Sequence, residues 1–429
     1  MIAIVGAGAA GLATAIFAAR RGAAESIVAL DGAARLGAKI LVSGGARCNV
    51  TNHAVTERDF AGGNPNVIRR ILRGFPADQA AAFFREIGVP LHEEPDGKLF
   101  PDSNRSRTVL EALVAEAGRR RVELRTSCRV RGVSRTARGF RIDTSRGAID
   151  AAQVVLATGG LSLPKTGSDG AGYAMAEAFG HTLVARTPAL VPLVLDGSFH
   201  RALAGVAHEA EVTLRPEGAR AIVRRGSLLW THFGASGPVV LDASRFWLHA
   251  VEEGRPVRVS ASLLPGRRFE EVEGGLLAQA AASPHIQVKG ALGDWLPASV
   301  AAAVPACLGV GPETRLSQLT REDRRRLVRG LLDFPLPVAA SRGYGYAEVT
   351  AGGVRLEEID PRTMASRRCP GLFLVGEILD VDGRIGGFNF QWAWSTAWVA
   401  AGGLVRATAE RAAGETAAGT GVVGSTPGE

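Results

Sequence analysis

The sequence of 429 residues predicts an α/β protein in which one three-layer domain is divided by an inserted domain of strands and helices. An apolar run at Ile2–Val5 meets a glycine-rich turn and then a helix of small residues. Short alternating runs without a βαβ rhythm fill residues 191–339, and a buried strand pattern returns at Gly371–Val375. These three observations assign residues 1–190 and 340–408 to the divided domain, and residues 191–339 to the insert.

The first turn has the spacing of a dinucleotide-binding fingerprint, Gly6-x-Gly8-x-x-Gly11. Gly6 allows the tight turn, Gly8 lets the backbone approach a pyrophosphate, and Gly11 lets the helix pack closely. The N-terminus of this helix offers free N–H groups and a positive dipole end to phosphates. A second apolar run stops at Asp31, where a carboxylate is placed to accept ribose hydroxyls. This order predicts a Rossmann-like domain rather than a glycine turn in an ordinary βαβ unit.

Two further stretches point to a flat polar ligand. Residues 40–52 (ILVSGGARCNVTN) show no helical or strand period, which predicts a loop offering backbone N–H groups at Gly44 and an amide at Asn49. The apolar run Asp150–Ala157 enters Thr158-Gly-Gly160. In flavoproteins with two dinucleotide-binding domains, such a strand passes beneath the FAD.

The pattern Gly386-Gly-x-Asn-x-Gln391 at the start of a helix narrows the cofactor to a flavin. A helix N-terminus directed at the pyrimidine edge of the isoalloxazine ring supplies N–H donors and partial positive charge. Both stabilise the negative charge that develops when the flavin is reduced. An amphipathic core helix explains Trp392 and Trp394, but it does not explain why the chain returns here to a fold begun at residue 1.

Six stretches together resemble the bacterial YhiN/BaiN-like flavoprotein family, which is related to aminoacetone oxidase. They are GAGAAG, SGGARCNVTN, ATGGLSLPKTGSDGAGY, THFGASGP, VTAGGVRLEEIDPRTMASR and GEILDVDGRIGGFNFQWAWSTAWVAAGG. The resemblance covers about residues 1–405. It implies a split, Rossmann-like FAD-binding domain of the glutathione-reductase-like superfamily, with an inserted β-barrel and helical domain.

The resemblance also implies a set of FAD contacts and shows two departures from the family pattern. Asp31 stands where Glu is usual, which favours a longer or water-mediated ribose contact, and Ala46 replaces a glycine. The implied contacts are Gly6, Gly8, Gly11, Asp31, Lys39, Gly44, Arg47, Asn49, the backbone of Val130, Thr158, Gly159, Gly376, Glu377, Gly387 and Asn389.

The activities of the family include amine oxidation and reduction of conjugated enones in steroid-like acids, so the resemblance fixes the cofactor better than the substrate. We predict an FAD-dependent oxidoreductase, of amine oxidase or enone reductase type, acting on a small or amphipathic organic substrate. NAD(P)H is left open as a transient co-substrate that comes to the flavin. The candidate catalytic side chains are Arg47, His232 and Tyr344, while Cys48 is interpreted as a small residue packed under the flavin.

The charge composition of the sequence limits the kinds of molecule that the protein is expected to bind. The net charge is +8, but the arginines are scattered without interleaved aromatic residues, which makes nucleic acid an unlikely partner. An RNA-acting flavoprotein and a flavin-binding sensor without turnover remain the alternatives.

The cysteines and the hydropathy pattern predict a cytoplasmic protein that does not insert in a membrane. The four cysteines have neither zinc-site nor redox-disulfide spacing, so no metal is predicted. The sequence begins directly with a strand pattern instead of a basic leader, and the most apolar stretch, Trp392–Val405, is too short to span a bilayer. Residues 409–429 are predicted to be a disordered tail.

Overall fold

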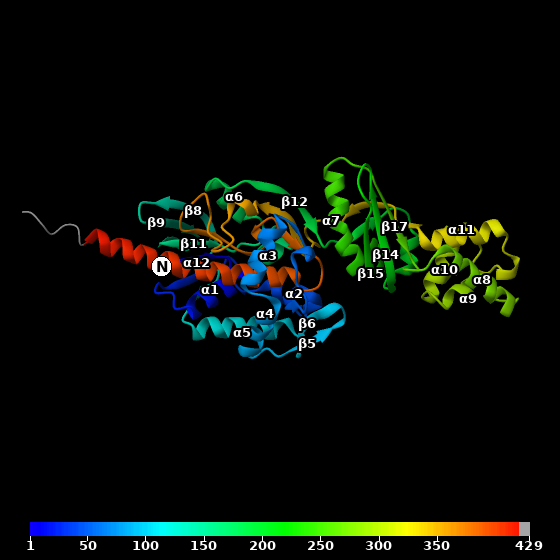
Figure 1. Ribbon diagram of the computed structural model, residues 1–429, viewed down its shortest axis with the longest axis horizontal. Helices are drawn as coiled ribbons and strands as arrows, with labels where there is room; N and C mark the ends of the chain where they lie inside the picture. Colours follow the sequence, from blue (N-terminus) through cyan, green and yellow to red (C-terminus); the bar gives the residue numbers. More distant parts are fainter. Residues whose placement is uncertain (420–429) are drawn as a thin grey trace, which may run out of the picture. The chain divides into compact units, whose positions relative to one another are not determined.

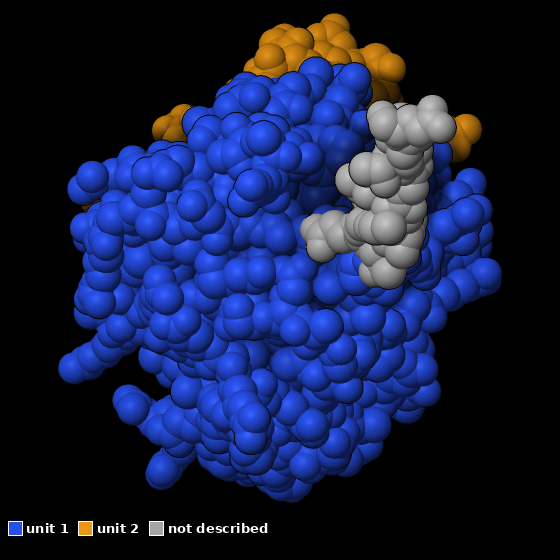
Figure 2. Space-filling model, turned by 90° about the vertical axis from the view of Figure 1, so that its left-hand side faces the viewer, with its two compact units in different colours: residues 1–186, 349–429 blue, residues 187–348 orange. Residues whose placement is uncertain are grey.

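The computed structural model describes residues 1–419, and the chain divides into two compact units. Unit 1 comprises Met1–Arg186 and Val349–Glu429, and unit 2 comprises Thr187–Glu348 (Figure 2). Each unit is built around its own cluster of buried apolar side chains.

A five-stranded parallel sheet forms the centre of unit 1, in the order β21-β11-β1-β2-β7. The strand β21, which follows unit 2 in the sequence, pairs with β11, so segments from both sides of unit 2 contribute to one sheet. This pairing confirms the predicted α/β fold. The strands are β1 (Ile2–Val5), β2 (Ile27–Leu30), β7 (Glu123–Arg125), β11 (Gln153–Leu156) and β21 (Leu372–Leu374).

Two helices from opposite ends of the sequence pack against each other in unit 1, α1 (Ala9–Arg20) and α12 (Phe388–Gly419) (Figure 1). Phe17 of α1 contacts Trp398 of α12, with ring centroids 5.2 Å apart. The guanidinium group of Arg21 lies 4.0 Å from the centroid of the same indole ring. Aromatic pairs and cation–π contacts of this kind add to the apolar area that the two helices bury.

Among the described residues of unit 1, five further helices and four small sheets surround this core. The sheets have the orders β10-β9-β8, β12-β20, β22-β4 and β3-β6-β5. The helices are α2 (Ala38–Ala46), α3 (Pro65–Gly74), α4 (Ala77–Glu86), α5 (Ser106–Arg119) and α6 (Ala171–Ala178), and the strands are β3 (Thr51–Asn52), β4 (Phe60–Gly62), β5 (Leu91–Glu94), β6 (Lys98–Pro101), β8 (Val130–Thr136), β9 (Gly139–Thr144), β10 (Gly147–Ala151), β12 (Leu183–Ala189), β20 (Val349–Val354) and β22 (Val381–Gly383).

The structure corrects two local predictions. Residues 40–52 do not form a continuous loop, because α2 includes their first part and is interrupted only at Ser43, Gly44 and Gly45. The apolar residues before Ser43 are enough for helical turns, and the two glycines adopt the left-handed conformation that breaks them. The tail expected to be disordered from residue 409 continues α12 to Gly419, and residues 420–429 lie outside the described part of the chain.

Unit 2 consists of one antiparallel sheet, the helix α7 beside it, and a group of four helices (Figure 1). The sheet order is β18-β17-β14-β15-β16-β13-β19. The elements are β13 (Leu193–Leu195), β14 (Ala207–Pro216), β15 (Ile222–Thr231), β16 (Gly234–Ser236), α7 (Pro238–Glu252), β17 (Val257–Ser262), α8 (Phe269–Ala282), α9 (Val288–Gly293), α10 (Ala298–Cys307), α11 (Arg321–Leu332), β18 (Phe334–Pro335) and β19 (Val338–Ser341).

The barrel expected in the insert takes the form of a sheet with two end strands, β18 and β19. Both end strands are short, and β18 contains Pro335, which has no N–H group to donate to a further strand. In the described part of the chain, no helix of either unit is long and apolar enough to cross a membrane.

A buried polar cluster ties the segment after β20 to the end of α6. His181, which follows α6, places Nδ1 2.9 Å from Glu358 Oε2. Glu358 also accepts hydrogen bonds from Thr182 and Arg368. Burial by itself raises the pKa of Glu358, but the hydrogen bonds from Arg368, Thr182 and His181 outweigh it and bring the pKa to about 2.

We predict that Glu358→Gln lowers the free energy of unfolding by about 1–3 kcal/mol at pH 7, because it leaves the buried His181 and the donors of Thr182 and Arg368 without a charged acceptor. The folded-state pKa of Glu358 lies below the value of about 4.3 for a free Glu. The charged form therefore stabilises the fold above that pH, and the contribution is lost as the pH falls toward 2. Thermal unfolding at pH 7 and pH 3 measures both effects. Glu357→Gln, at an exposed neighbour, is the control, and an equal loss in both variants contradicts the prediction.

Candidate functional site

Four of the predicted segments follow the carboxyl ends of four neighbouring strands. Gly6 follows β1, Asp31 follows β2, Thr158 lies just beyond β11, and Gly376 lies just beyond β21. In an open parallel sheet these ends meet at one edge, where such folds bind their ligands. The structure therefore brings together residues that the sequence places up to 370 positions apart.

The three glycines of the first turn are under different steric constraints. A Cβ added at Gly6 would lie 2.4 Å from the carbonyl oxygen of Ala157, and one added at Gly11 would lie 1.9 Å from that of Gly6. The packing of the chain itself thus requires both glycines. A Cβ added at Gly8 would meet no atom of the described residues within 4 Å, apart from its two neighbours in the chain. The described chain itself therefore sets no steric requirement for a glycine at position 8, and space is open beside the turn.

The same space faces the start of α1, which no side chain caps in the described structure. Gly8 is the N-cap residue, and the first turn carries no acidic side chain. The N–H groups of this first helical turn and the positive end of the helix dipole are therefore available to an anion.

Asp31 is held in place by the backbone of the same turn. Its Oδ2 accepts a hydrogen bond from the N–H of Ala7 at 2.9 Å, and its Oδ1 accepts one from the N–H of Ala33 at 2.8 Å. Its carbonyl oxygen accepts a hydrogen bond from Cys128, two residues before Val130 begins β8. Each carboxylate oxygen keeps a second acceptor position for a hydroxyl group.

Lys39 and Glu377 form an ion pair at the centre of a polar cluster. Lys39 Nζ lies 2.5 Å from Glu377 Oε2 and donates to Ser162 Oγ at 2.6 Å. Ser162 donates to Glu377 Oε1, which also accepts a hydrogen bond from the N–H of Thr350. Ser162 and Thr350 were not predicted as site residues, because neither hydroxyl stands at a spacing that belongs to a known motif. The cluster joins four distant segments and fixes the ammonium group of Lys39.

The segment after the break in α2 holds several non-glycine residues in the left-handed region. The φ angles of Ala46 and Cys48 are 65° and 63°, and those of Gly44 and Gly45 are 55° and 67°. Burial raises the pKa of the Cys48 thiol to about 12, which favours the protonated, less nucleophilic form. The interpretation of Cys48 as a packed residue agrees with this environment.

Asn49 carries an unpaired acceptor at this place. Its Oδ1 is buried and makes no hydrogen bond to the described residues. A Cβ added at Gly387 would lie 2.9 Å from this oxygen and 2.5 Å from the carbonyl oxygen of Thr51. The segment 43–52 and the start of α12 therefore approach each other closely, and a buried amide oxygen is left for another donor.

The side chain of Asn389 has a structural function that the sequence did not predict. Its Oδ1 accepts from the N–H of Gly383, and its Nδ2 donates to the carbonyl oxygen of the same residue, both at 2.8 Å. Nearby, Thr51 donates to Gln391 Oε1 at 2.6 Å. These bonds fix the backbone that enters α12.

The other predicted residues of unit 1 are placed by contacts with the chain. A Cβ added at Gly376 would lie 2.8 Å from that of Ala10 in α1, so Gly376 packs on the start of this helix. Gly159 has a φ of 71° beside Ser168. Arg47 pairs with Glu94 at 2.5 Å, and its guanidinium group lies 4.2 Å from the centroid of the Phe100 ring.

His232 and Tyr344, the other two catalytic candidates, belong to unit 2. His232 is exposed, and its ring packs against Phe233. The guanidinium group of Arg342 lies between two rings, 4.3 Å from the centroid of Phe233 and 3.6 Å from that of Tyr346. Tyr346 is 54% exposed, so this stack presents an aromatic face and guanidinium donors on unit 2.

The parallel sheet, the glycine turn at its edge and the converging C-terminal segments define a Rossmann-fold flavoprotein that binds FAD. The chain belongs to the family described as HI0933-like protein Rossmann domain, which matches residues 1–403. This membership confirms the predicted resemblance and makes the protein an FAD-dependent oxidoreductase.

Curated relatives match along nearly the whole length. The ribosomal RNA dihydrouridine synthase of Escherichia coli (strain K12) is 35% identical over 407 residues, which cover 94% of this chain and 98% of that protein. The 3-dehydro-bile acid delta(4,6)-reductase of Clostridium scindens is 33% identical over 410 residues, with 96% and 99% coverage. The ribosomal RNA dihydrouridine synthase of Haemophilus influenzae is 32% identical over 406 residues, with 93% and 96% coverage.

Gly8 and Gly11 allow a paired prediction. Gly8→Ala adds a methyl group in open space and leaves the folding of the apoprotein unchanged, but it weakens FAD binding about tenfold, because it occupies the space beside the turn. Gly11→Ala drives a methyl group into the carbonyl of Gly6 and destabilises the apoprotein itself. Thermal unfolding of both apoproteins and fluorescence titration with FAD separate the two effects. Unchanged FAD affinity in Gly8→Ala refutes the assignment of this space.

Proposed function

We propose that the protein is an FAD-dependent reductase of carbon–carbon double bonds conjugated to a carbonyl group. The space at Gly8, beside the uncapped start of α1, is the observation that supports the position of the cofactor. The names of the relatives support the reaction type. Dihydrouridine is uridine with its ring double bond reduced, and a delta(4,6)-reductase acts on double bonds too.

The proposed FAD contacts divide by chemistry. Gly6, Gly8 and Gly11 admit the pyrophosphate at the helix N-terminus, and Asp31 accepts the ribose hydroxyls. The ammonium group of Lys39, oriented by Glu377, donates a charged hydrogen bond to the cofactor. The other proposed contacts are those that the family resemblance implies, namely Gly44, Arg47, Asn49, the backbone of Val130, Thr158, Gly159, Gly376, Gly387 and Asn389.

FAD supplies hydride chemistry when bound, and the protein supplies position and electrostatics. The N-terminal turn of α12, entered through Gly387, offers N–H donors and partial positive charge to an acceptor oxygen. The Tyr346 face and the Arg342 guanidinium suit a planar ring that carries carbonyl oxygens. NAD(P)H is the proposed electron donor, and the four free cysteines fit a cytoplasmic location.

A reduction assay tests the proposal. The FAD-loaded protein is reduced without oxygen by NADPH or NADH, then mixed with a 3-oxo-4-ene steroid, uridine or oxygen, while the visible absorbance of the flavin is followed. We expect at least one of the two unsaturated compounds to reoxidise the flavin faster than oxygen does. Reduction of the flavin by a primary amine, followed by fast reoxidation in air, identifies an amine oxidase instead. A flavin that no donor reduces identifies a sensor.

Ribosomal RNA is a second candidate substrate, because two of the relatives above are named for it and the net charge of this chain is +8. The sequence made nucleic acid an unlikely partner, and a direct measurement tests that expectation. Unmodified ribosomal RNA replaces uridine in the same assay, and binding is measured over a range of salt concentrations. A steep loss of affinity with salt, together with dihydrouridine in the product, supports this candidate.

Lys39→Met provides a residue-level prediction. The change removes the ammonium group that Glu377 and Ser162 hold, so we expect FAD to bind about tenfold more weakly, as is typical when one charged hydrogen bond is lost. Lys165→Met, at an exposed lysine, is the matched control and retains wild-type affinity. Fluorescence titration of both apoproteins measures the difference, and equal affinities argue against a contact at Lys39.

A further inference from the structure

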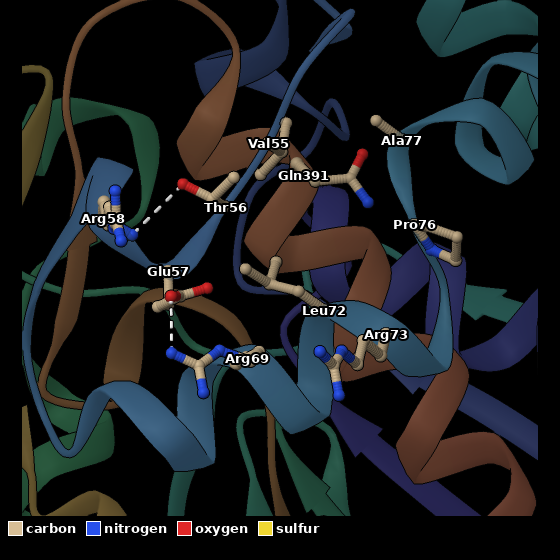
Figure 3. A pocket seen from close by; sticks show the side chains of 10 residues that line it. All are labelled: Val55, Thr56, Glu57, Arg58, Arg69, Leu72, Arg73, Pro76, Ala77 and Gln391. Carbon is tan, nitrogen blue, oxygen red and sulfur yellow. Dashed lines mark hydrogen bonds and ion pairs between the residues drawn. The ribbon is translucent and has the colours of Figure 1, made fainter.

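A hollow of unit 1 lies between the 3-10 helix η1 (Glu57–Asp59), α3 and the start of α12 (Figure 3). Its volume is about 510 Å³, which is within the range of small-molecule sites. One part of its wall is apolar, and the other part carries three guanidinium groups and one carboxylate. The lining residues are Val55, Thr56, Glu57, Arg58, Arg69, Leu72, Arg73, Pro76, Ala77 and Gln391.

The charges of this hollow do not balance. Arg69 Nη2 lies 2.6 Å from Glu57 Oε1, and this hydrogen bond lowers the pKa of Glu57 to about 2, so the carboxylate stays ionised. Neither Arg58 nor Arg73 forms an ion pair with any carboxylate within residues 1–419. Two positive charges are therefore left facing the hollow.

The guanidinium groups are presented by two fixed elements. Arg69 and Arg73 lie one turn apart on α3, side by side at one edge of the hollow in Figure 3. Like charges at this spacing repel each other, so an isolated helix does not favour them. Arg58 comes from η1, where Thr56 Oγ1 accepts from the N–H of Arg58 and Asp59 Oδ2 accepts from the N–H of Thr56. This capping box holds the position of η1.

We propose that this hollow binds the phosphate ester group of a nucleotide or polynucleotide. Guanidinium forks match the oxygens of a phosphate group, and charge-assisted hydrogen bonds to it are strong. The apolar wall at Leu72 and Pro76 gives space for the group that carries the phosphate. Phosphate esters are thus the class of ligand that both parts of the wall suit.

The hollow is also linked to the segment 43–52 through one residue. Gln391 lines it and accepts a hydrogen bond from Thr51, and its Nε2 donates to the carbonyl oxygen of Phe75 at 2.8 Å. Thr51 belongs to the segment 43–52 that approaches Gly387. A phosphate ester in the hollow would therefore lie next to the backbone that enters α12.

Calorimetric titration of the oxidised, FAD-loaded protein tests the proposal without turnover, so its outcome does not depend on the proposed reduction. The probes are NADP⁺, NAD⁺ and a short oligouridylate. We expect NADP⁺, the oligouridylate or both to bind, and Arg73→Gln and Arg58→Gln each to weaken that binding about tenfold. Arg70→Gln removes the same charge from an exposed position of α3 that does not line the hollow, and it leaves the affinity within about twofold.

The outcomes separate the sources of the phosphate. Binding of NADP⁺ in preference to NAD⁺ identifies a nucleotide with an additional phosphate, and binding of the oligouridylate alone identifies a polynucleotide. Absence of binding by every probe overturns the proposal. An equal loss in Arg70→Gln and Arg73→Gln also overturns it, because the interaction is then with the general charge of the surface. Visible absorbance of the bound FAD shows that each variant is folded.

Discussion

The rest of unit 1 depends on one constraint, the parallel pairing of β21 with β11 beside β1. This register brings the end of β21 next to the ends of two strands from the first part of the chain. Gly376 then packs on Ala10 of α1, and Glu377 reaches Lys39 across 338 positions of sequence. Backbone hydrogen bonds of the sheet thereby assemble the candidate site, because its residues come from distant segments that only the sheet brings together.

The sequence predicted those parts of the site that a local rule controls. The turn at Gly6 and Gly11 follows from steric contact within one strand–turn–helix unit, and Asp31 follows from the length of the next strand. Ser162 and Thr350 were missed, since only the folded sheet brings these hydroxyls to Glu377. The motif at Asn389 was recognised, but its amide bonds to Gly383, and no spacing rule predicts that pairing.

The fold, like the site, was predicted correctly where a local sequence pattern controls the structure. The buried strands and the fingerprint helix were recognisable because their apolar patterns are long or distinctive. The helix α2 was missed because its glycines, Gly44 and Gly45, removed the periodic signal just where the helix breaks. Strands of unit 2 were predicted, but which of them end the sheet was not. Pro335 in β18 cannot donate to a further strand, and the other pairings join distant segments that no local pattern connects.

The left-handed residues Ala46 and Cys48 show how the segment 43–52 is held. A non-glycine residue in this conformation costs about 1–2 kcal/mol, so two of them oppose folding unless their surroundings stabilise them. Cys48 is fully buried, and its N–H donates to the carbonyl oxygen of Ser43 at 3.1 Å. Burial thus helps to keep Cys48 in a costly conformation, while the oxygen of its neighbour Asn49 is left without a donor from the described chain. Strain and an unsatisfied buried acceptor within the same four residues are typical of a segment shaped for a ligand rather than for stability.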